Sequence, residues 1–142
     1  METKYNALVS SLILGTFWTF WHLPLFFMTE ASRMGIPMPI YLLLVVTQTV
    51  YLTWLYNNTY GSSIITTLAH WCYNLTGVFI TGAVTLMPAM IFYMTAGPLL
   101  FLVSVAVVIL YGPRNLSRKQ ASDLAYIRED KVRVAGELPE SG

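Results

Sequence analysis

The chain alternates between long apolar runs and short polar breaks. Four runs are each close to the length of about 20 residues that a helix needs to cross about 30 Å of hydrocarbon. A membrane-spanning segment must satisfy its own backbone groups, so we expect helices even where β-branched residues are frequent. The pattern predicts an all-α, polytopic membrane helix bundle with about four transmembrane helices. The predicted helices cover residues 6–27, 40–56, 62–82 and 89–111, the second being the shortest.

The breaks between these runs contain turn-forming residues. Two prolines and a glycine lie in the break at 28–39, and Gly61 precedes two serines that can cap the third helix. Gly112 and Pro113 end the fourth run, because proline cannot continue a helix. We therefore expect a transmembrane region over 1–111, followed by a short soluble tail.

Charged residues are scarce and unevenly placed. The chain is 56% hydrophobic and 11% charged, and no Asp, Glu, Lys or Arg lies between Arg33 and Arg114. A soluble domain would need charge to cover its surface over such a stretch, whereas a lipid bilayer needs none. No basic cluster is dense enough to predict a nucleic-acid partner. The expected partner of the apolar surface is the lipid bilayer.

Basic residues flank both ends of the apolar region. Lys4 precedes the first run, and Arg114, Arg118 and Lys119 follow the fourth. Lys and Arg concentrate on the cytoplasmic side of membrane proteins, and four crossings return the chain to its starting side. The prediction is a multi-pass protein of the cell membrane with both termini, including the tail at 112–142, in the cytoplasm.

Three strongly polar side chains stand out inside the predicted helices: His22, His70 and Asn74. Such groups are costly in lipid, so each needs a partner or a role. On the third run they belong to one polar face. That face comprises Ser63, Thr66, Thr67, His70, Asn74, Gly77 and Thr81. Spacing alone leaves three interpretations open: an interhelical hydrogen-bond network, a metal site, or a catalytic cluster. Two histidines and an amide make a poor zinc site, which needs three or four N, S or carboxylate ligands.

Two of these segments resemble motifs of one membrane-protease family. The string Trp18-x-x-x-His22-Leu-Pro is similar to the second motif of the CPBP family, and His70-x-x-x-Asn74 is similar to its later H-x-x-x-N motif. That family comprises the CAAX prenyl endopeptidases and the bacteriocin-processing, Abi-type membrane proteases. The resemblance covers approximately residues 5–111, and it makes 1–111 a partial CPBP-type transmembrane domain.

The resemblance implies an intramembrane endopeptidase that acts on peptide or protein substrates. In the family, a glutamate and the histidine at the position of His22 polarise a water molecule that attacks the scissile carbonyl. The residues at the positions of His70 and Asn74 stabilise the oxyanion. The implied catalytic residues are therefore His22, His70 and Asn74. A divalent metal such as zinc stays an open alternative, with His22 and His70 as its candidate ligands.

The sequence departs from the family in one decisive place. The family's glutamate motif, E-E-x-x-x-R, is absent, and neither Glu2 nor Glu30 is placed to substitute for it. We therefore interpret the chain as the C-terminal half of such a protease. A non-catalytic membrane protein, truncated or vestigial and with a binding or immunity role, is the alternative. A small transporter or channel subunit is a third interpretation, which leaves the Trp-His-Leu-Pro string unexplained.

Two structural expectations follow from the half-bundle interpretation. His22 lies about 16 residues into its helix and His70 about 8, so helices that start level would hold them about 12 Å apart in depth. A first helix that protrudes into the cytoplasm would remove this conflict. The polar face of the third helix would be uncovered, so the isolated chain is expected to form homo-oligomers or to be poorly stable in detergent.

Overall fold

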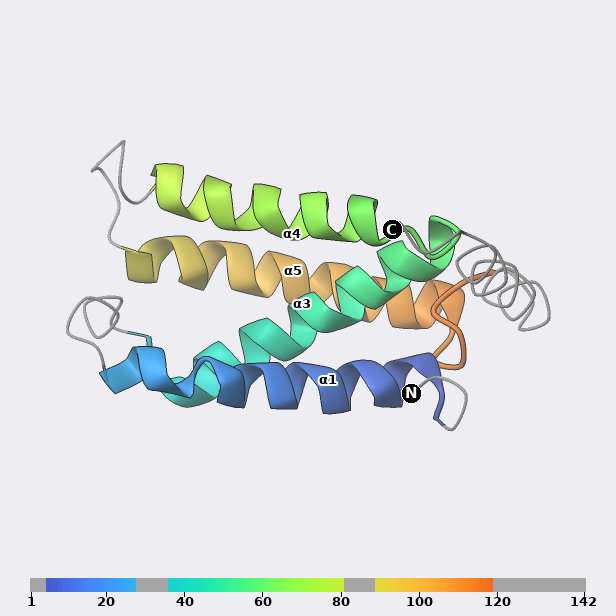
Figure 1. Cartoon of the computed structure of the whole chain (residues 1–142), viewed down its shortest axis with the longest axis horizontal. Coiled ribbons are helices and arrows are strands. Elements are labelled where there is room, and N and C mark those ends of the chain that lie inside the picture. The colour runs from blue at the N-terminus through green and yellow to red at the C-terminus, as the bar shows by residue number, and fades with distance from the viewer. Residues whose placement is uncertain (1–4, 28–35, 81–88, 119–142) are drawn as a thin grey trace, which may run out of the picture.

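The computed structural model describes residues 5–27, 36–80 and 89–118. All of the regular structure in these residues is helical and none of it is strand, which confirms the all-α prediction (Figure 1). The elements are α1 (Ala7–Trp21), the 3₁₀ helix η1 (Leu23–Phe27), α3 (Met38–Asn58), α4 (Ser63–Val78) and α5 (Ala89–Tyr111).

Two helix boundaries differ from those expected. The first α-helix ends at Trp21 and gives way to η1, where a single helix over 6–27 was predicted. Pro24 explains the difference, because it lacks a backbone N–H and disfavours helical geometry in the residue before it. The second helix was predicted to be the shortest, but α3 has 21 residues and is longer than α1, which has 15. It begins before residue 40 because the proline in its first turn is tolerated there.

The cap predicted at Ser62 and the stop predicted at Gly112 are present, and Asn6 adds a cap that was not predicted. Asn6 Oδ1 accepts a hydrogen bond of 2.8 Å from the Val9 N–H at the start of α1. Ser62 caps α4, and Gly61 before it adopts a φ of +66°, which suits glycine. Gly112 follows α5 with a φ of +76°. These local signals fix where each helix begins or ends.

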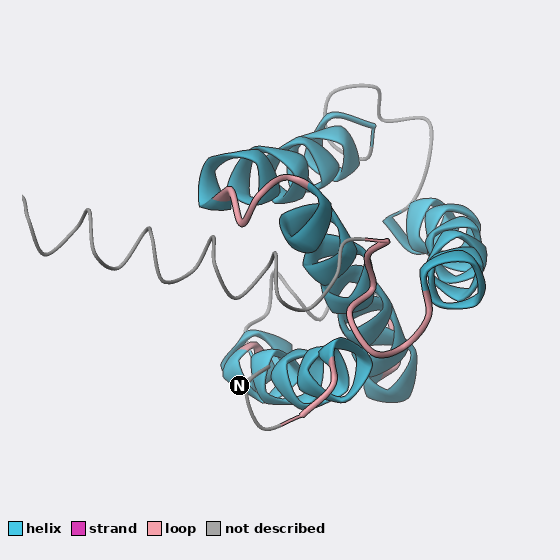
Figure 2. Cartoon of the chain, turned by 90° about the vertical axis from the view of Figure 1, so that its right-hand side faces the viewer, coloured by secondary structure: helices cyan, strands magenta, loops and turns pink. Residues whose placement is uncertain are grey.

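Helix α3 is the centre of the fold. It crosses obliquely between the other three helices and contacts each of them (Figures 1 and 2). It lies closest to α1, where a Cβ added at Gly15 would be 2.8 Å from Val46 Cα. Hydrogen bonds tie α3 on both sides: the hydroxyls of Ser11 and Thr53 are bonded to each other over 2.8 Å, and Ser104 Oγ of α5 donates to the Thr47 carbonyl over 3.0 Å. Small residues thus let helices approach and bond, as in membrane bundles.

The segment after α5 closes one end of the bundle. The backbone N–H of Ala7 donates to the carbonyl of Arg114 over 2.8 Å, which joins this segment to the start of α1. Asn57 Nδ2 donates to the Asn115 carbonyl over 2.8 Å, which joins it to the end of α3. Leu116 is fully buried beneath these contacts. The first residues of the expected tail, 112–118, therefore pack on the bundle, while 119–142 lie outside the described residues.

Most hydroxyl side chains in the helices are bonded to their own helix. Each of several Thr and Ser residues donates to the carbonyl four positions earlier, over 2.6 to 3.0 Å. The set includes Ser11, Thr16, Thr19, Thr47, Thr49, Thr66, Thr76 and Thr95. This pattern satisfies the hydroxyl without a partner from another helix.

The outer surface of the bundle is apolar. Large hydrophobic side chains are exposed on every helix, among them Trp21, Ile64 and Ile109 at about three quarters of their full exposure. By length and composition, Met38–Asn58 and Ile91–Tyr111 could each cross a membrane, and Ala7–Trp21 is a shorter apolar helix. An apolar surface of this extent fits a lipid environment or a partner protein, and not contact with water.

The close approach of α1 to α3 makes a matched pair of glycine substitutions informative. Gly15→Ala forces Cβ against the backbone of Val46, so we expect it to destabilise the fold by about 1–3 kcal/mol. Gly97→Ala meets only the flexible end of the Leu44 side chain and should be neutral or stabilising. Unfolding in mixed micelles, followed by the helical circular dichroism signal, gives both values. Equal effects of the two substitutions would contradict the proposed packing.

Candidate active site

The three site residues predicted from the sequence meet at one cavity. It has a volume of about 80 Å³ and is lined by residues of all four α-helices and by His22, which follows α1 directly. The lining consists of Trp18, His22, Tyr41, Leu44, Val45, Gln48, His70, Tyr73, Asn74 and Tyr93. The expected mismatch in depth is absent, since α1 begins farther toward the closed end of the bundle than α4 does (Figure 1). His22 and His70 therefore face the same space.

His22 owes its position to the end of α1. The following Leu-Pro pair stops the α-helix, so His22 becomes the C-cap residue and its ring turns back along the last turn. Its Nδ1 lies 2.8 Å from the Trp18 carbonyl oxygen. A carbonyl oxygen can only accept, so Nδ1 carries the proton in this contact. In the neutral ring, Nε2 then keeps its lone pair and can accept a proton from a water molecule.

His70 is held between two amide side chains. Asn74 comes one turn later on α4, and its Nδ2 lies 2.9 Å from His70 Nε2. From the other side, Gln48 of α3 places its Nε2 3.2 Å from His70 Nδ1. Both ring nitrogens are thus engaged, and the ring orientation is fixed from two helices.

Trp18 contacts the rings of both histidines. Its ring centroid is 5.9 Å from that of His22 and 5.0 Å from that of His70, with tilted planes in both pairs. The Tyr41 ring of α3 also contacts His22, with ring centroids 6.0 Å apart. Each imidazole thus packs against at least one aromatic ring.

The sequence motifs do not include several of the residues at this cavity. Gln48 and the tyrosines Tyr41, Tyr73 and Tyr93 all line it. Gln48 had a signal of its own, because it is the one amide side chain within the apolar run 40–56. The tyrosines had none, since tyrosine is frequent throughout the chain.

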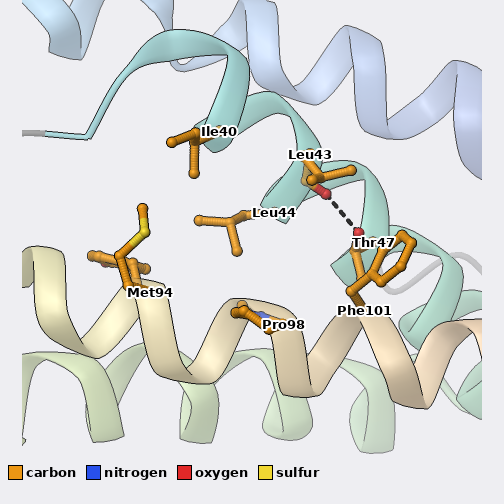
Figure 3. A pocket seen from close by; sticks show the side chains of 9 residues that line it. Ile40, Leu43, Leu44, Thr47, Met94, Pro98 and Phe101 are labelled. Atoms are coloured by element: carbon orange, nitrogen blue, oxygen red, sulfur yellow. Dashed lines mark hydrogen bonds between the residues drawn. The ribbon is translucent and has the colours of Figure 1, made fainter.

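A second cavity adjoins the first between α3 and α5. It has a volume of about 250 Å³, and its lining is almost entirely apolar (Figure 3). Apart from Tyr93, the one lining residue with a hydroxyl group is Thr47. Its Oγ1 donates to the Leu43 carbonyl over 2.6 Å and so presents no free donor. Leu44 and Tyr93 belong to the walls of both cavities. The polar site therefore has an apolar neighbour of larger volume.

The described residues do not form a metal-binding cluster. No group of three or more His, Cys, Asp or Glu side chains in 5–27, 36–80 and 89–118 could hold a metal ion. His22 and His70 supply two imidazoles at the cavity, one ligand short of the smallest protein set for zinc. The residues present thus do not fit a metal on their own.

A comparison with known families decides the relationship of the chain. The family model of the type II CAAX prenyl endopeptidase, Rce1-like, matches residues 1–76, more than half of the chain. The chain belongs to this family. The match includes Trp18, His22, His70 and Asn74, and it confirms the resemblance seen in the sequence motifs. No curated protein and no solved structure matched the chain.

The contact between His70 and Asn74 can be tested by a double-mutant cycle. We expect His70→Ala and Asn74→Ala to be coupled by about 1 kcal/mol in unfolding free energy, because the two side chains share a hydrogen bond. The matched control is the pair His22→Ala and Asn74→Ala, which line the same cavity without that bond. Additive effects in the first pair would contradict the geometry.

Proposed function

We propose that this chain carries the histidine and amide half of a membrane-embedded, CAAX-type endopeptidase site that cleaves peptide or protein substrates. The observation that supports this most directly is the convergence of His22, His70 and Asn74 on one cavity. Family membership supports the same reaction class. The catalytic residues of the proposal are these three.

In the proposed reaction, His22 takes part in activating water. Its Nδ1–H donates to the Trp18 carbonyl, so Nε2 is the atom that accepts a proton from the attacking water. A carboxylate beside it would raise its basicity, as general-base catalysis at neutral pH requires. The scissile carbonyl then becomes a tetrahedral oxyanion, which the bonded pair His70 and Asn74 would stabilise through an amide N–H donor at the cavity.

The carboxylate of this mechanism comes from outside the described residues, which contain no Asp or Glu. We propose that a helix beyond these 142 residues supplies it and lies against the groove between α1 and α4. That groove has a volume of about 330 Å³, and Trp18 lines both it and the histidine cavity. Hydroxyl groups predominate among its polar lining residues: Thr49, Thr53, Tyr56, Ser63, Thr66 and Thr67. A polar helix could find hydrogen-bond partners there.

The apolar cavity between α3 and α5 supports a substrate with an apolar segment. It shares walls with the histidine cavity, so an apolar group bound there would lie within reach of the site. Burial of such a group supplies binding energy remote from the reacting bond.

We further propose that all four α-helices cross the cell membrane and that both termini are cytoplasmic. The basic residues Arg114 and Arg118 follow α5, at the end of the bundle where α1 begins. Positive charge on that side favours a cytoplasmic location. The polar groove along α4 favours contact with a further helix or with a second copy of the chain.

A C-terminal reporter tests this topology in a bacterial membrane. A fluorescent protein fused after Gly142 should fold and fluoresce, because the proposed C-terminus is cytoplasmic, whereas a periplasm-dependent phosphatase at the same place should be inactive. The matched control moves both reporters to the break at 28–35, where their signals should be exchanged. An active phosphatase after Gly142 would contradict the proposed orientation.

The missing carboxylate generates the central test of the proposed activity. The DNA upstream of the Met1 codon should encode, in one of its three frames, an apolar helix with E-E-x-x-x-R. The chain extended by that helix should cleave peptides in proteoliposomes. His22→Ala should lower kcat/KM by about 10²–10⁴-fold, because it removes the general base. Asn74→Ala should lower it by about 10²–10³-fold through loss of an oxyanion donor.

The control for these variants is Cys72→Ser, which changes an exposed residue of α4 away from the cavity and should leave activity unchanged. If no glutamate helix is encoded upstream, the alternative of a non-catalytic family member with a binding or immunity role becomes the better account. The lack of any acidic side chain at the described site is the observation that favours this second function.

A further inference from the structure

His70 is enclosed by two amides in an arrangement that constrains the direction of both hydrogen bonds. Gln48 Nε2 is 3.2 Å from Nδ1, and Asn74 Nδ2 is 2.9 Å from Nε2. A neutral imidazole has one N–H and one lone pair, so it can accept from only one of the two amides. The other amide must present its oxygen to the ring, since the two ends of an amide group have nearly the same shape. The choice between the amides decides the tautomer of His70.

We propose that Gln48 makes this choice as a positioning residue: its amide donates to His70 Nδ1 and holds the ring in the Nε2–H form. Burial distinguishes the two amides. Gln48 is 8% exposed within the central helix α3, whereas Asn74 is an exposed residue of α4 at the cavity. The buried side chain has little freedom to turn, so the exposed one adapts to it. His70 Nε2–H then donates to Asn74 Oδ1.

This arrangement has a direct consequence at the cavity. Once its oxygen accepts from His70, the Asn74 amide nitrogen no longer faces the ring, so its N–H donors can bond another group in the cavity. The donors then run in one direction, from Gln48 through His70 to Asn74, and successive hydrogen bonds of this kind polarise each other. A carbonyl oxygen that develops negative charge would meet a prepared N–H group. This last step rests on the proposed function, whereas the tautomer of His70 does not.

Sequence reasoning from the family motifs does not reach Gln48, because it lies on a different helix from both motifs. Its place opposite His70 results from the oblique path of α3 between α1 and α4 (Figure 2). The residue proposed to set the tautomer of the His70 ring therefore comes from α3, the helix against which α1, α4 and α5 all pack.

Nitrogen NMR on the ¹⁵N-histidine-labelled chain in micelles tests the proposal, because the sequence contains only two histidines. Spectra are recorded at about pH 9, well above the ordinary pKa of a histidine side chain. The wild-type His70 should show a protonated Nε2 and a bare Nδ1. Gln48→Glu should place a proton on Nδ1, since a carboxylate can only accept. Asn74→Asp should leave the wild-type tautomer in place, because Nε2 already carries the proton.

Two controls accompany this measurement. His22 should show a protonated Nδ1 in every variant, because its partner is the Trp18 carbonyl, and this signal reports that the fold is intact. Asn6→Asp makes the same amide-to-carboxylate change at the N-cap of α1, at the other end of that helix from His22, and should alter neither histidine. A wild-type His70 protonated at Nδ1, or a tautomer that responds to Asn74→Asp and not to Gln48→Glu, would overturn the proposal. Because no cleavage is measured, this result is independent of whether the chain acts in proteolysis.

Discussion

The close contact between α1 and α3 at Gly15 is the constraint on which the rest of the structure depends. Any side chain at that position would meet the backbone of Val46, so the two helices can approach this closely only at a glycine. Trp18 lies on α1 just beyond this contact, His22 follows the end of that helix, and Gln48 lies two residues after Val46 on α3. The crossing therefore brings the histidine of one helix to the same cavity as the amide of the other. A wider separation would enlarge the cavity and disperse its polar groups.

The helices and the central site residues were predictable because their signals are local. Apolar runs of membrane-spanning length, ended by glycine and proline, located four helices, and the spacing of four residues placed His70 and Asn74 on one face. The proline after His22 was also visible, yet its effect in ending α1 early and turning the ring of His22 back was not foreseen. The role of Gln48 and the meeting of the histidines at one depth depend on how α3 crosses its neighbours. No local pattern in the sequence specifies that crossing.

The cavity combines a base, two amides and aromatic walls, and its chemistry is incomplete in a defined way. His22 keeps a lone pair on Nε2 because its Nδ1–H donates to the Trp18 carbonyl, and His70 is held by an amide at each ring nitrogen. The cavity therefore contains hydrogen-bond donors and a proton acceptor. The described residues contribute no carboxylate. The described cavity thus holds hydrogen-bond donors and an acceptor but not the carboxylate that the proposed reaction requires.

The hydroxyl groups bonded to their own helices affect how this chain enters a membrane. A threonine whose Oγ1 donates to the carbonyl four residues earlier has its hydroxyl proton satisfied within the helix, so its side chain behaves more like that of valine. Hydropathy scales count each such residue as polar and therefore overstate the free energy of transferring these helices from the translocon into lipid. Helix α4, with hydroxyls at Thr66 and Thr76 bonded in this way, would partition into the bilayer more readily than its composition indicates.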